Sequence, residues 1–316
     1  MKKFKNIIGS IVFLGGLTGI LLLLSVALAP RGDIYNAVTV ESKREALLKE
    51  EADTIDVIVV GDSETYSAYS PLQMFKEHGI TSYICGTSAQ RLCDTVSILE
   101  TAFETQSPNL IVLETNCFFR YAGSTQNADY DVLNDAAKIF PVLKHHNRWK
   151  QYLGLAGVSN KEMECLRKGF KLRTDTIAYE GGEWMKETDK RKNFSGMVDE
   201  YLEQIYALCE ENGTELVLVT TPAPTNWTYA KHNAVSDWAS EKDVKYLDMN
   251  LVCDELALDW SNDTRDGGNH LNYNGAKKVS AYFGEYLASE FELTDHREEE
   301  QYLSWNDAVK NSGLGI

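Results

Sequence analysis

Val57-Ile58-Val59-Val60-Gly61-Asp62-Ser63-Glu64 is the stretch of this chain that predicts its fold most directly. Its four apolar β-branched residues predict a strand that is buried on both faces, as the strands of a parallel sheet are. The strand ends in a glycine, an acid and a serine, so the serine hydroxyl would lie at the carboxyl-terminal edge of the sheet. Ser63 is therefore a candidate nucleophile, although a Gly-Asp-Ser turn can also end a strand without any catalytic role.

The rest of the chain alternates between strand-like and helical patterns. This alternation is typical of a parallel sheet that helices cover on both faces. We therefore predict an α/β fold, a three-layer α/β/α sandwich around a five-stranded parallel sheet. The strands are expected at about residues 55–60, 80–85, 110–115, 215–220 and 244–248.

Further candidate site residues follow the later strands. Gly86 follows the second strand and Asn116 the third, and His270 lies near the C-terminus after two glycines. A serine hydroxyl is a poor nucleophile unless a neighbouring base takes its proton. His270 is the predicted base; His232 is the second candidate and is otherwise expected to line the cleft.

In this order, Ser63, Gly86, Asn116 and His270 resemble the four blocks of the SGNH/GDSL hydrolase superfamily, over about residues 55–290. The resemblance implies a flavodoxin-like strand order 2-1-3-4-5 and a serine that attacks acyl esters. It also implies an oxyanion hole formed by the backbone N–H groups of Ser63 and Gly86 and by the Asn116 side chain.

Shorter runs resemble a membrane-anchored bacterial branch of that superfamily. Its members accompany membrane-bound O-acyltransferases in cell-envelope acylation, including the D-alanylation of teichoic acid. The runs that carry this resemblance are Ser70-Pro71-Leu72, residues 227–233 and His270-Leu271-Asn272.

The chain departs from the family pattern in its orienting acid and in its third block. The family aspartate stands three residues before the histidine, where this chain has Gly267. Asp266, four residues before His270, is our predicted orienting acid because the two glycines allow the loop to bend. Asp263 and a plain Ser-His dyad remain alternatives. The third block reads Glu114-Thr115-Asn116-Cys117 in place of Gly-x-Asn-Asp.

Three residues are expected to contact the substrate, namely Glu64, Trp227 and His232. Glu64 stands where many relatives carry leucine; it either faces the substrate or is an acid favoured at a helix N-terminus. Trp227 and Trp260 lie in segments expected on the catalytic side, where an exposed indole can stack on a sugar ring. Core packing is the alternative for Trp260.

The N-terminal segment predicts a membrane anchor. Residues 7–29 carry no charge and follow Lys2, Lys3 and Lys5. At about 1.5 Å per residue they cover roughly 34 Å, enough for a bilayer core of about 30 Å. A signal peptide is the alternative, but Pro30 directly after Ala27-Leu28-Ala29 would hinder cleavage. The lysines would then stay in the cytoplasm and the rest of the chain would lie outside.

The predicted organisation has five parts. A long segment after the third strand is expected to form a helical insertion that caps the active-site edge, with a helix at 132–140. The parts are a cytoplasmic tail (1–6), the anchor (7–29), a juxtamembrane stalk (30–54), the SGNH-type domain (55–294, with the insertion at about 117–193) and a C-terminal tail (295–316).

Composition excludes some classes of function. The net charge of −16 argues against a nucleic-acid partner. The six cysteines lack metal-like spacing, and Cys209 belongs to the apolar stripe of a helix. The adjacent pair His145-His146 points in different directions on a helix. We therefore predict neither a metal nor another cofactor.

Together these features predict a single-pass membrane protein with an extracytoplasmic serine esterase or O-acyltransferase domain that acts on a cell-envelope glycan. The expected partners are an acylated polysaccharide and a membrane-bound O-acyltransferase. The alternative is a non-catalytic SGNH scaffold that docks such an acyltransferase or binds polysaccharide. Intact Ser63 and His270 favour the enzyme, whereas the shifted aspartate favours the scaffold.

Overall fold

The computed structural model describes residues 2–28, 39–120 and 161–316, and between 120 and 161 only 129, 132–133, 136–137, 139–145 and 149. The chain divides into two compact units, which are described separately. The first comprises Met1–Ala37 and Gly123–Asn160; the second comprises Val38–Ala122 and Lys161–Ile316.

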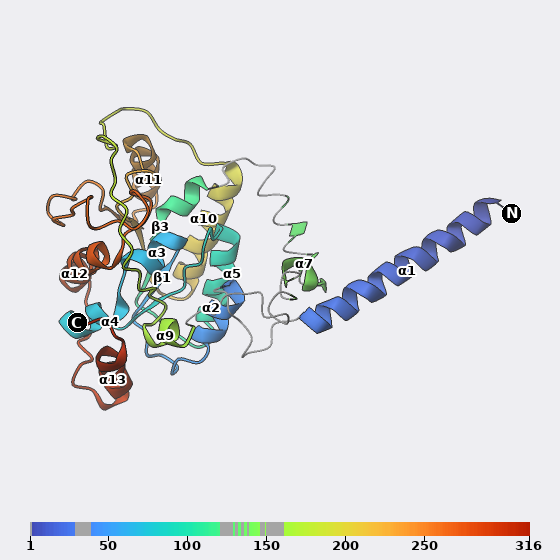
Figure 1. Ribbon diagram of the computed structural model, residues 1–316, viewed down its shortest axis with the longest axis horizontal. Coiled ribbons are helices and arrows are strands. Elements are labelled where there is room, and N and C mark those ends of the chain that lie inside the picture. Colours follow the sequence, from blue (N-terminus) through green and yellow to red (C-terminus); the bar gives the residue numbers. More distant parts are fainter. Residues whose placement is uncertain are drawn as a thin grey trace. The chain divides into compact units, whose positions relative to one another are not determined.

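A parallel sheet forms the centre of the second unit (Figure 1). Within the described residues it has five strands in the order β2-β1-β3-β4-β5, and every neighbouring pair is parallel. The predicted fold class and strand order are confirmed. The strands are β1 (Val57–Val60), β2 (Ser82–Ile84), β3 (Leu110–Glu114), β4 (Glu215–Thr220) and β5 (Lys245–Asp248).

Side chains alternate between the two faces of β1, as they do along any strand. Ile58 and Val60 belong to one apolar cluster and Val57 and Val59 to the other, and all four are fully buried. Helices α5 (Leu92–Ala102), α10 (Gly196–Glu211) and α11 (Tyr229–Glu241) contribute to the first cluster, and α4 (Pro71–His78) and α12 (Tyr273–Glu290) to the second. Figure 1 shows α5 and α10 on one side of the sheet and α4 and α12 on the other.

The ends and buried faces of these helices follow from their sequences. Helix α4 begins with Pro71 and ends at Gly79, whose φ of 76° is left-handed and therefore favours glycine. Cys209 lies on the buried stripe of α10 with Leu202 and Ile205. A third apolar cluster joins α4 to α13 (Leu303–Asn311), where Phe75 and Trp305 pack with ring centroids 5.3 Å apart.

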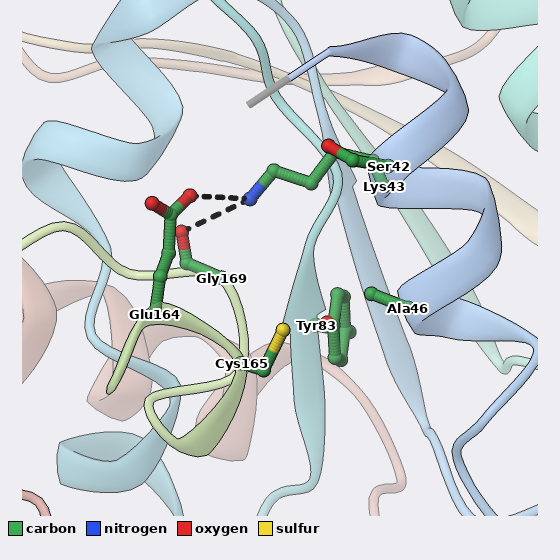
Figure 2. Close-up of a pocket in the computed structure, with 7 residues that line it drawn as sticks. All are labelled: Ser42, Lys43, Ala46, Tyr83, Glu164, Cys165 and Gly169. Carbon is green, nitrogen blue, oxygen red and sulfur yellow. Dashed lines mark hydrogen bonds and ion pairs between the residues drawn. The ribbon is translucent and has the colours of Figure 1, made fainter. Parts of the chain in front are cut away.

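Helix α2 (Val40–Leu47) packs within the second unit, although it comes from the segment that we predicted to be a stalk. Its Leu47 is fully buried. The Lys43 ammonium lies 3.1 Å from Glu164 of α9 (Lys161–Leu166) and donates to the Gly169 carbonyl at 3.3 Å (Figure 2). This buried ion pair fixes residues 39–48 to the rest of the unit.

The first unit contains helix α1 (Lys2–Leu28) and the short helix α7 (Val142–His145). Residues 6–28 of α1 are long and apolar enough to cross a membrane, a property that a signal sequence shares. Within this unit the Val142 N–H donates to the Ser25 hydroxyl at 3.2 Å. The predicted helix at 132–140 lies partly outside the described residues. Residues 146–148, which include His146, lie wholly outside them.

Candidate active site

The candidate nucleophile lies at the end of β1. Gly61 has a φ of +146°, and a Cβ atom there would lie 2.7 Å from the Cβ of Glu114, so only glycine fits. Asp62 then caps α3 (Ser63–Ala68) by accepting from the Glu64 N–H at 3.2 Å. Ser63 is the first residue of α3, and the chain reversal at Gly61 places it at the carboxyl edge of the sheet.

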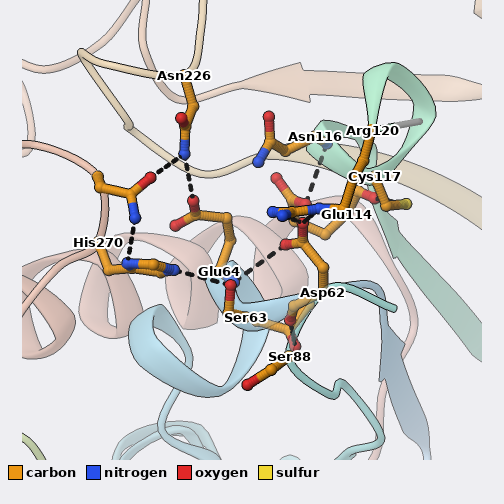
Figure 3. A network of polar contacts seen from close by, with 12 residues as sticks. Asp62, Ser63, Glu64, Ser88, Glu114, Asn116, Cys117, Arg120, Asn226 and His270 are labelled. Atoms are coloured by element: carbon orange, nitrogen blue, oxygen red, sulfur yellow. Dashed lines mark hydrogen bonds and ion pairs between the residues drawn. The ribbon is translucent and has the colours of Figure 1, made fainter. Parts of the chain in front are cut away.

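Ser63, His270 and Asp266 form a hydrogen-bonded chain. The Ser63 Oγ lies 2.7 Å from His270 Nε2, and His270 Nδ1 lies 2.6 Å from Asp266 Oδ2 (Figure 3 shows the serine and the histidine). Asp266 also accepts from the His270 backbone N–H at 2.7 Å through its other oxygen. This arrangement places the imidazole proton on Nδ1 and leaves Nε2 free to accept from the serine.

Two glycines allow Asp266 to reach a histidine only four residues later. Gly267 and Gly268 have φ angles of 75° and 92°, which side chains rarely adopt. Thr264 closes the loop, because its hydroxyl donates to the His270 carbonyl at 2.9 Å and accepts from the Gly268 N–H at 2.8 Å. The loop is therefore a small closed turn that holds the acid against the imidazole.

The electrostatics of the pair fit a base that is neutral near pH 7. Burial lowers the pKa of His270 below 6.5 and the nearby Arg265 lowers it further, while Asp266 partly offsets both. Burial alone would raise the pKa of Asp266, but hydrogen bonds from the His270 ring and backbone bring it below its usual range. An ionised acid next to a neutral imidazole is the state that a Ser-His-Asp site requires.

The alternative acid and base have other partners. Asp263 accepts from the Asp259 N–H at 2.7 Å and from Lys278 at 2.6 Å. His232 Nδ1 lies 2.9 Å from Asp248, and its ring stacks on Tyr246. Neither residue contacts His270 or Ser63.

Three possible donors for an oxyanion are unused by the protein. The backbone N–H groups of Ser63 and Gly86 and the side-chain amide of Asn116 form no hydrogen bond among the described residues. Asn116 lies in the first turn of η2 (Thr115–Phe119), where its backbone N–H donates to the Glu114 side chain at 3.0 Å. In Figure 3 its amide extends from η2 toward the middle of the network.

Three acidic side chains, Asp62, Glu64 and Glu114, are fully buried close to the serine (Figure 3). Arg120 donates twice to Asp62, at 2.9 and 2.6 Å, and so balances its charge. Burial and then the charge of Asp62 raise the pKa values of Glu64 and Glu114 well above 4.5. Burial and the neighbouring carboxylates therefore favour the neutral form of both glutamates.

Two asparagines connect Glu64 to His270. The Asn226 amide contacts Glu64 Oε1 at 3.2 Å and the Asn269 amide, which in turn lies 2.8 Å from His270 Nδ1. Asn226 donates to both Glu64 and Asn269, so it links the buried carboxyl group to the residue beside the catalytic imidazole.

Two predicted substrate contacts are wrong. Glu64 is fully buried, because the residue after Ser63 on α3 turns by about 100° toward the sheet and its carboxyl group bonds to Asn226. Trp227 is 1% exposed; its indole packs against Phe119 and its N–H donates to Asp248 at 2.9 Å. Its ring face is therefore covered by protein.

Residues 168–193, called the strap below, cross the loop that runs from Thr264 to His270, called the catalytic loop. Among the described parts of the predicted insertion, the strap lies nearest the site. Its Ile177 and Tyr179 N–H groups donate to the carbonyls of Thr264 and Trp260. Tyr179, Trp184 and Trp260 form a half-buried aromatic cluster with ring centroids 5.4 to 6.3 Å apart.

Sequence reasoning missed Arg265 and the Asn226–Asn269 connection. Arg265 donates to Ser67 Oγ at 3.0 Å and lies 3.7 Å from Asp266. Its position directly before the proposed acid, in an acidic chain, was the available signal. The asparagine contacts join positions 64, 226 and 269, and no local pattern reveals them.

Comparisons with known proteins give the following result. No family model and no curated protein matches the chain. Among solved structures it is similar to a GDSL-like lipase from Bacteroides thetaiotaomicron (11% identity, 80% of this chain and 99% of that one, TM-score 0.41). It is also similar to a lipase/acylhydrolase from Enterococcus faecalis (9% identity, 76% and 99% covered, TM-score 0.39).

An acetyl xylan esterase is a further similar structure, at 14% identity and a TM-score of 0.27 over 73% of this chain and 99% of that one. These similarities are too weak to support an argument about activity. The function must therefore be inferred from the geometry of Ser63, His270 and Asp266.

Proposed function

We propose that this chain is an SGNH-type serine ester hydrolase or O-acyltransferase that uses Ser63 as its nucleophile. The observation that carries the proposal is the continuous contact from Ser63 Oγ through the His270 ring to Asp266, at 2.7 and 2.6 Å. This series of contacts lets the neutral imidazole take the serine proton, while the acid keeps the other imidazole proton on Nδ1.

The proposed reaction has two steps. Ser63 Oγ attacks the acyl carbonyl, its proton passes to His270 Nε2, and the ester C–O bond breaks as the imidazolium protonates the leaving alcohol. Water, or a hydroxyl of an acceptor glycan, then gives a proton to His270 and attacks the seryl ester. The bond between the acyl carbon and Ser63 Oγ breaks, and the imidazolium returns the proton to Ser63 Oγ. The N–H groups of Ser63 and Gly86 and the Asn116 amide would stabilise the negative carbonyl oxygen in both steps.

The proposed setting is the outer surface of a bacterial cell membrane. Helix α1 would be the uncleaved anchor, with the lysines before it in the cytoplasm and the catalytic unit outside. The proposed substrate is an acylated cell-envelope polysaccharide or similar ester, and a membrane-bound O-acyltransferase is the proposed protein partner. Hydrolysis and transfer would differ only in which hydroxyl attacks the seryl ester.

Hydrolysis of p-nitrophenyl acetate by the full-length chain in detergent tests the proposal. We expect nitrophenol release that falls at least a thousandfold in Ser63→Ala and in His270→Ala. Adding an oligosaccharide acceptor distinguishes hydrolysis from transfer by the mass of the product. A rate that Ser63→Ala leaves unchanged would contradict the proposal and favour a non-catalytic scaffold.

A further inference from the structure

A polar pocket of about 180 Å³ lies beside the catalytic residues. Three segments that are distant in sequence form it: Tyr66 comes from α3, Arg265 from the catalytic loop, and Lys171, Arg173 and Asp175 from the strap. None of the steps proposed above uses it.

The pocket is positively charged in a chain whose net charge is −16. It gathers three cationic side chains and one carboxylate, Asp175. Among the described residues, neither Lys171 nor Arg173 forms an ion pair, and Asp175 pairs with none of the three cations. Arg265 is held by Ser67 and by the more distant carboxylate of Asp266.

The charges that act on the Lys171 ammonium are mostly positive. Burial lowers the pKa of this ammonium; Glu164 partly offsets the effect, whereas Arg173, Lys43 and Arg265 lower the pKa further. Its nearest aromatic neighbour is the Tyr66 ring, with Nζ 5.2 Å from the centroid. A bound anion would relieve the repulsion among these cations.

Backbone contacts hold the pocket in place before any ligand arrives. The Lys171 N–H donates to the Tyr66 carbonyl at 2.9 Å, and the Tyr273 N–H donates to the Arg173 carbonyl at 2.7 Å. The Asn272 side chain donates to the Asp175 carbonyl at 3.2 Å. The side chains of Lys171, Arg173 and Asp175 all line the pocket from this one segment.

The pocket is close to the proposed nucleophile. The Ser67 hydroxyl, which accepts from Arg265 at 3.0 Å, donates to the Ser63 carbonyl at 2.6 Å. Ser63 and Ser67 stand four residues apart on α3, and such positions are about 5 to 6 Å apart at Cβ. A group bound by Arg265 would therefore lie within the length of one sugar or glycerol unit from the ester.

We propose that this pocket binds an anionic group, a phosphate or a carboxylate, on the substrate whose ester Ser63 attacks. The substrate class would then be an acyl ester of a phosphate-bearing or carboxylate-bearing polyol or sugar. Arginine forks and a lysine are the donors that bind such anions, and Asp175 leaves the pocket with a net positive charge. This inference rests on the proposed function of Ser63.

Binding to the full-length chain in detergent provides a test that does not depend on activity. Isothermal titration calorimetry would compare sn-glycerol 3-phosphate and glucuronic acid with glycerol and glucose as neutral counterparts. The test variant is Lys171→Met/Arg173→Met, and the control is Lys310→Met, which removes one positive charge from an exposed side chain of α13. Arg265 is left intact because it contacts Asp266.

We expect one of the two anions to bind the wild type and Lys310→Met with equal affinity, and the double variant at least tenfold more weakly. The anion that binds identifies the group as phosphate or carboxylate. If neither anion binds, or if the double variant binds as tightly as the wild type, the inference is wrong. Arg173→Gln, at an exposed side chain, replaces the double variant if the latter fails to fold.

Esterase assays separate this inference from the proposed function. Two pairs of substrates are compared by kcat/KM: acetylated glycerol 3-phosphate with acetylated glycerol, and acetylated glucuronate with acetylated glucose. In one of the two pairs the anionic substrate should have a kcat/KM more than ten times that of the neutral one. The ratio should approach one in Lys171→Met/Arg173→Met. A wild type that hydrolyses both members of each pair equally contradicts the anion site and leaves the role of Ser63 intact. Anion binding without any hydrolysis contradicts the role of Ser63 instead.

Discussion

Replacing Asp266 by asparagine should harm catalysis more than replacing it by alanine. The two oxygens of Asp266 have different partners: Oδ1 accepts from the His270 backbone N–H at 2.7 Å and Oδ2 faces His270 Nδ1 at 2.6 Å. In Asp266→Asn the backbone N–H retains the amide oxygen, so the new NH₂ group faces Nδ1. The imidazole then carries its proton on Nε2 and cannot accept one from Ser63.

The expected size of the effect follows from the exposure of the acid. The equivalent substitution in a buried protease triad costs about 10⁴ in kcat. The Asp266 side chain is 34% exposed, so water partly replaces it, and we expect a loss of about 10³ for Asp266→Asn, or about 4 kcal/mol. In Asp266→Ala, water can accept the Nδ1 proton, and a loss of about 10² is expected.

The assay is the pre-steady-state and steady-state hydrolysis of p-nitrophenyl acetate at pH 8, with thermal unfolding to verify that each variant folds. Asp263→Asn is the comparison, because Asp263 was the other candidate acid and its carboxylate bonds to Lys278. It should lower the melting temperature more than kcat. If Asp263→Asn lost more activity than Asp266→Asn, or if alanine were worse than asparagine at position 266, the reasoning would be refuted.

Further predictions follow from buried charged and titratable groups. Burial and Arg265 lower the pKa of His270, and this base must be neutral to act. The pH profile of kcat/KM should therefore rise with pH through a midpoint below 6.5. Arg265→Gln should raise that midpoint. Burial raises the pKa of Glu64 and so favours its neutral form, which glutamine resembles; Glu64→Gln should therefore keep kcat within about threefold of the wild type, by RT ln 3 or about 0.7 kcal/mol. The pKa of Glu64 in the folded state lies above the unfolded value of 4.5, so the free energy of unfolding falls as pH rises above about 4.5, by up to about 1.4 kcal/mol per pH unit. Glu64→Gln should remove this part of the pH dependence of stability. Lys43→Met leaves Glu164 buried without its partner and should lower the free energy of unfolding by about 3 kcal/mol in chemical denaturation.

Each of these predictions has a control and a contradicting result. Lys310→Met should leave the kcat/KM midpoint in place, and a midpoint above 6.5 in the wild type would contradict the lowered pKa of His270. A large loss of kcat in Glu64→Gln would mean that the group acts as an ionised carboxylate. Lys43→Met/Glu164→Met should recover most of the stability lost in Lys43→Met; equal losses would show that the ion pair is not the cause.

The fold was predictable because its signals are local. Strands β1, β3 and β4 read as short apolar runs, and Gly61 and Gly79 mark turns that only glycine adopts easily. The contact of Asp266 with His270 was also predictable despite the unusual spacing, because consecutive glycines allow a tight bend. Three intervening residues are enough when Gly267 and Gly268 both take positive φ.

What could not be predicted depends on contacts between distant segments. Trp227 follows a strand on the catalytic side, and only the packed structure shows its indole covered by Phe119 and bonded to Asp248. Glu64 is acidic and next to the serine, yet its burial depends on the rotation of α3 above the sheet. The cationic pocket combines Lys171 and Arg265, which nothing in the linear pattern connects.

The most direct test of the account is covalent labelling of the full-length chain with a fluorophosphonate, followed by intact mass and peptide mapping. The account predicts one added phosphonyl group on Ser63, abolished in Ser63→Ala and slowed at least a hundredfold in His270→Ala. A folded wild-type chain that remains unlabelled, or labelling on another residue that persists in Ser63→Ala, would contradict the claim that this serine is an activated nucleophile.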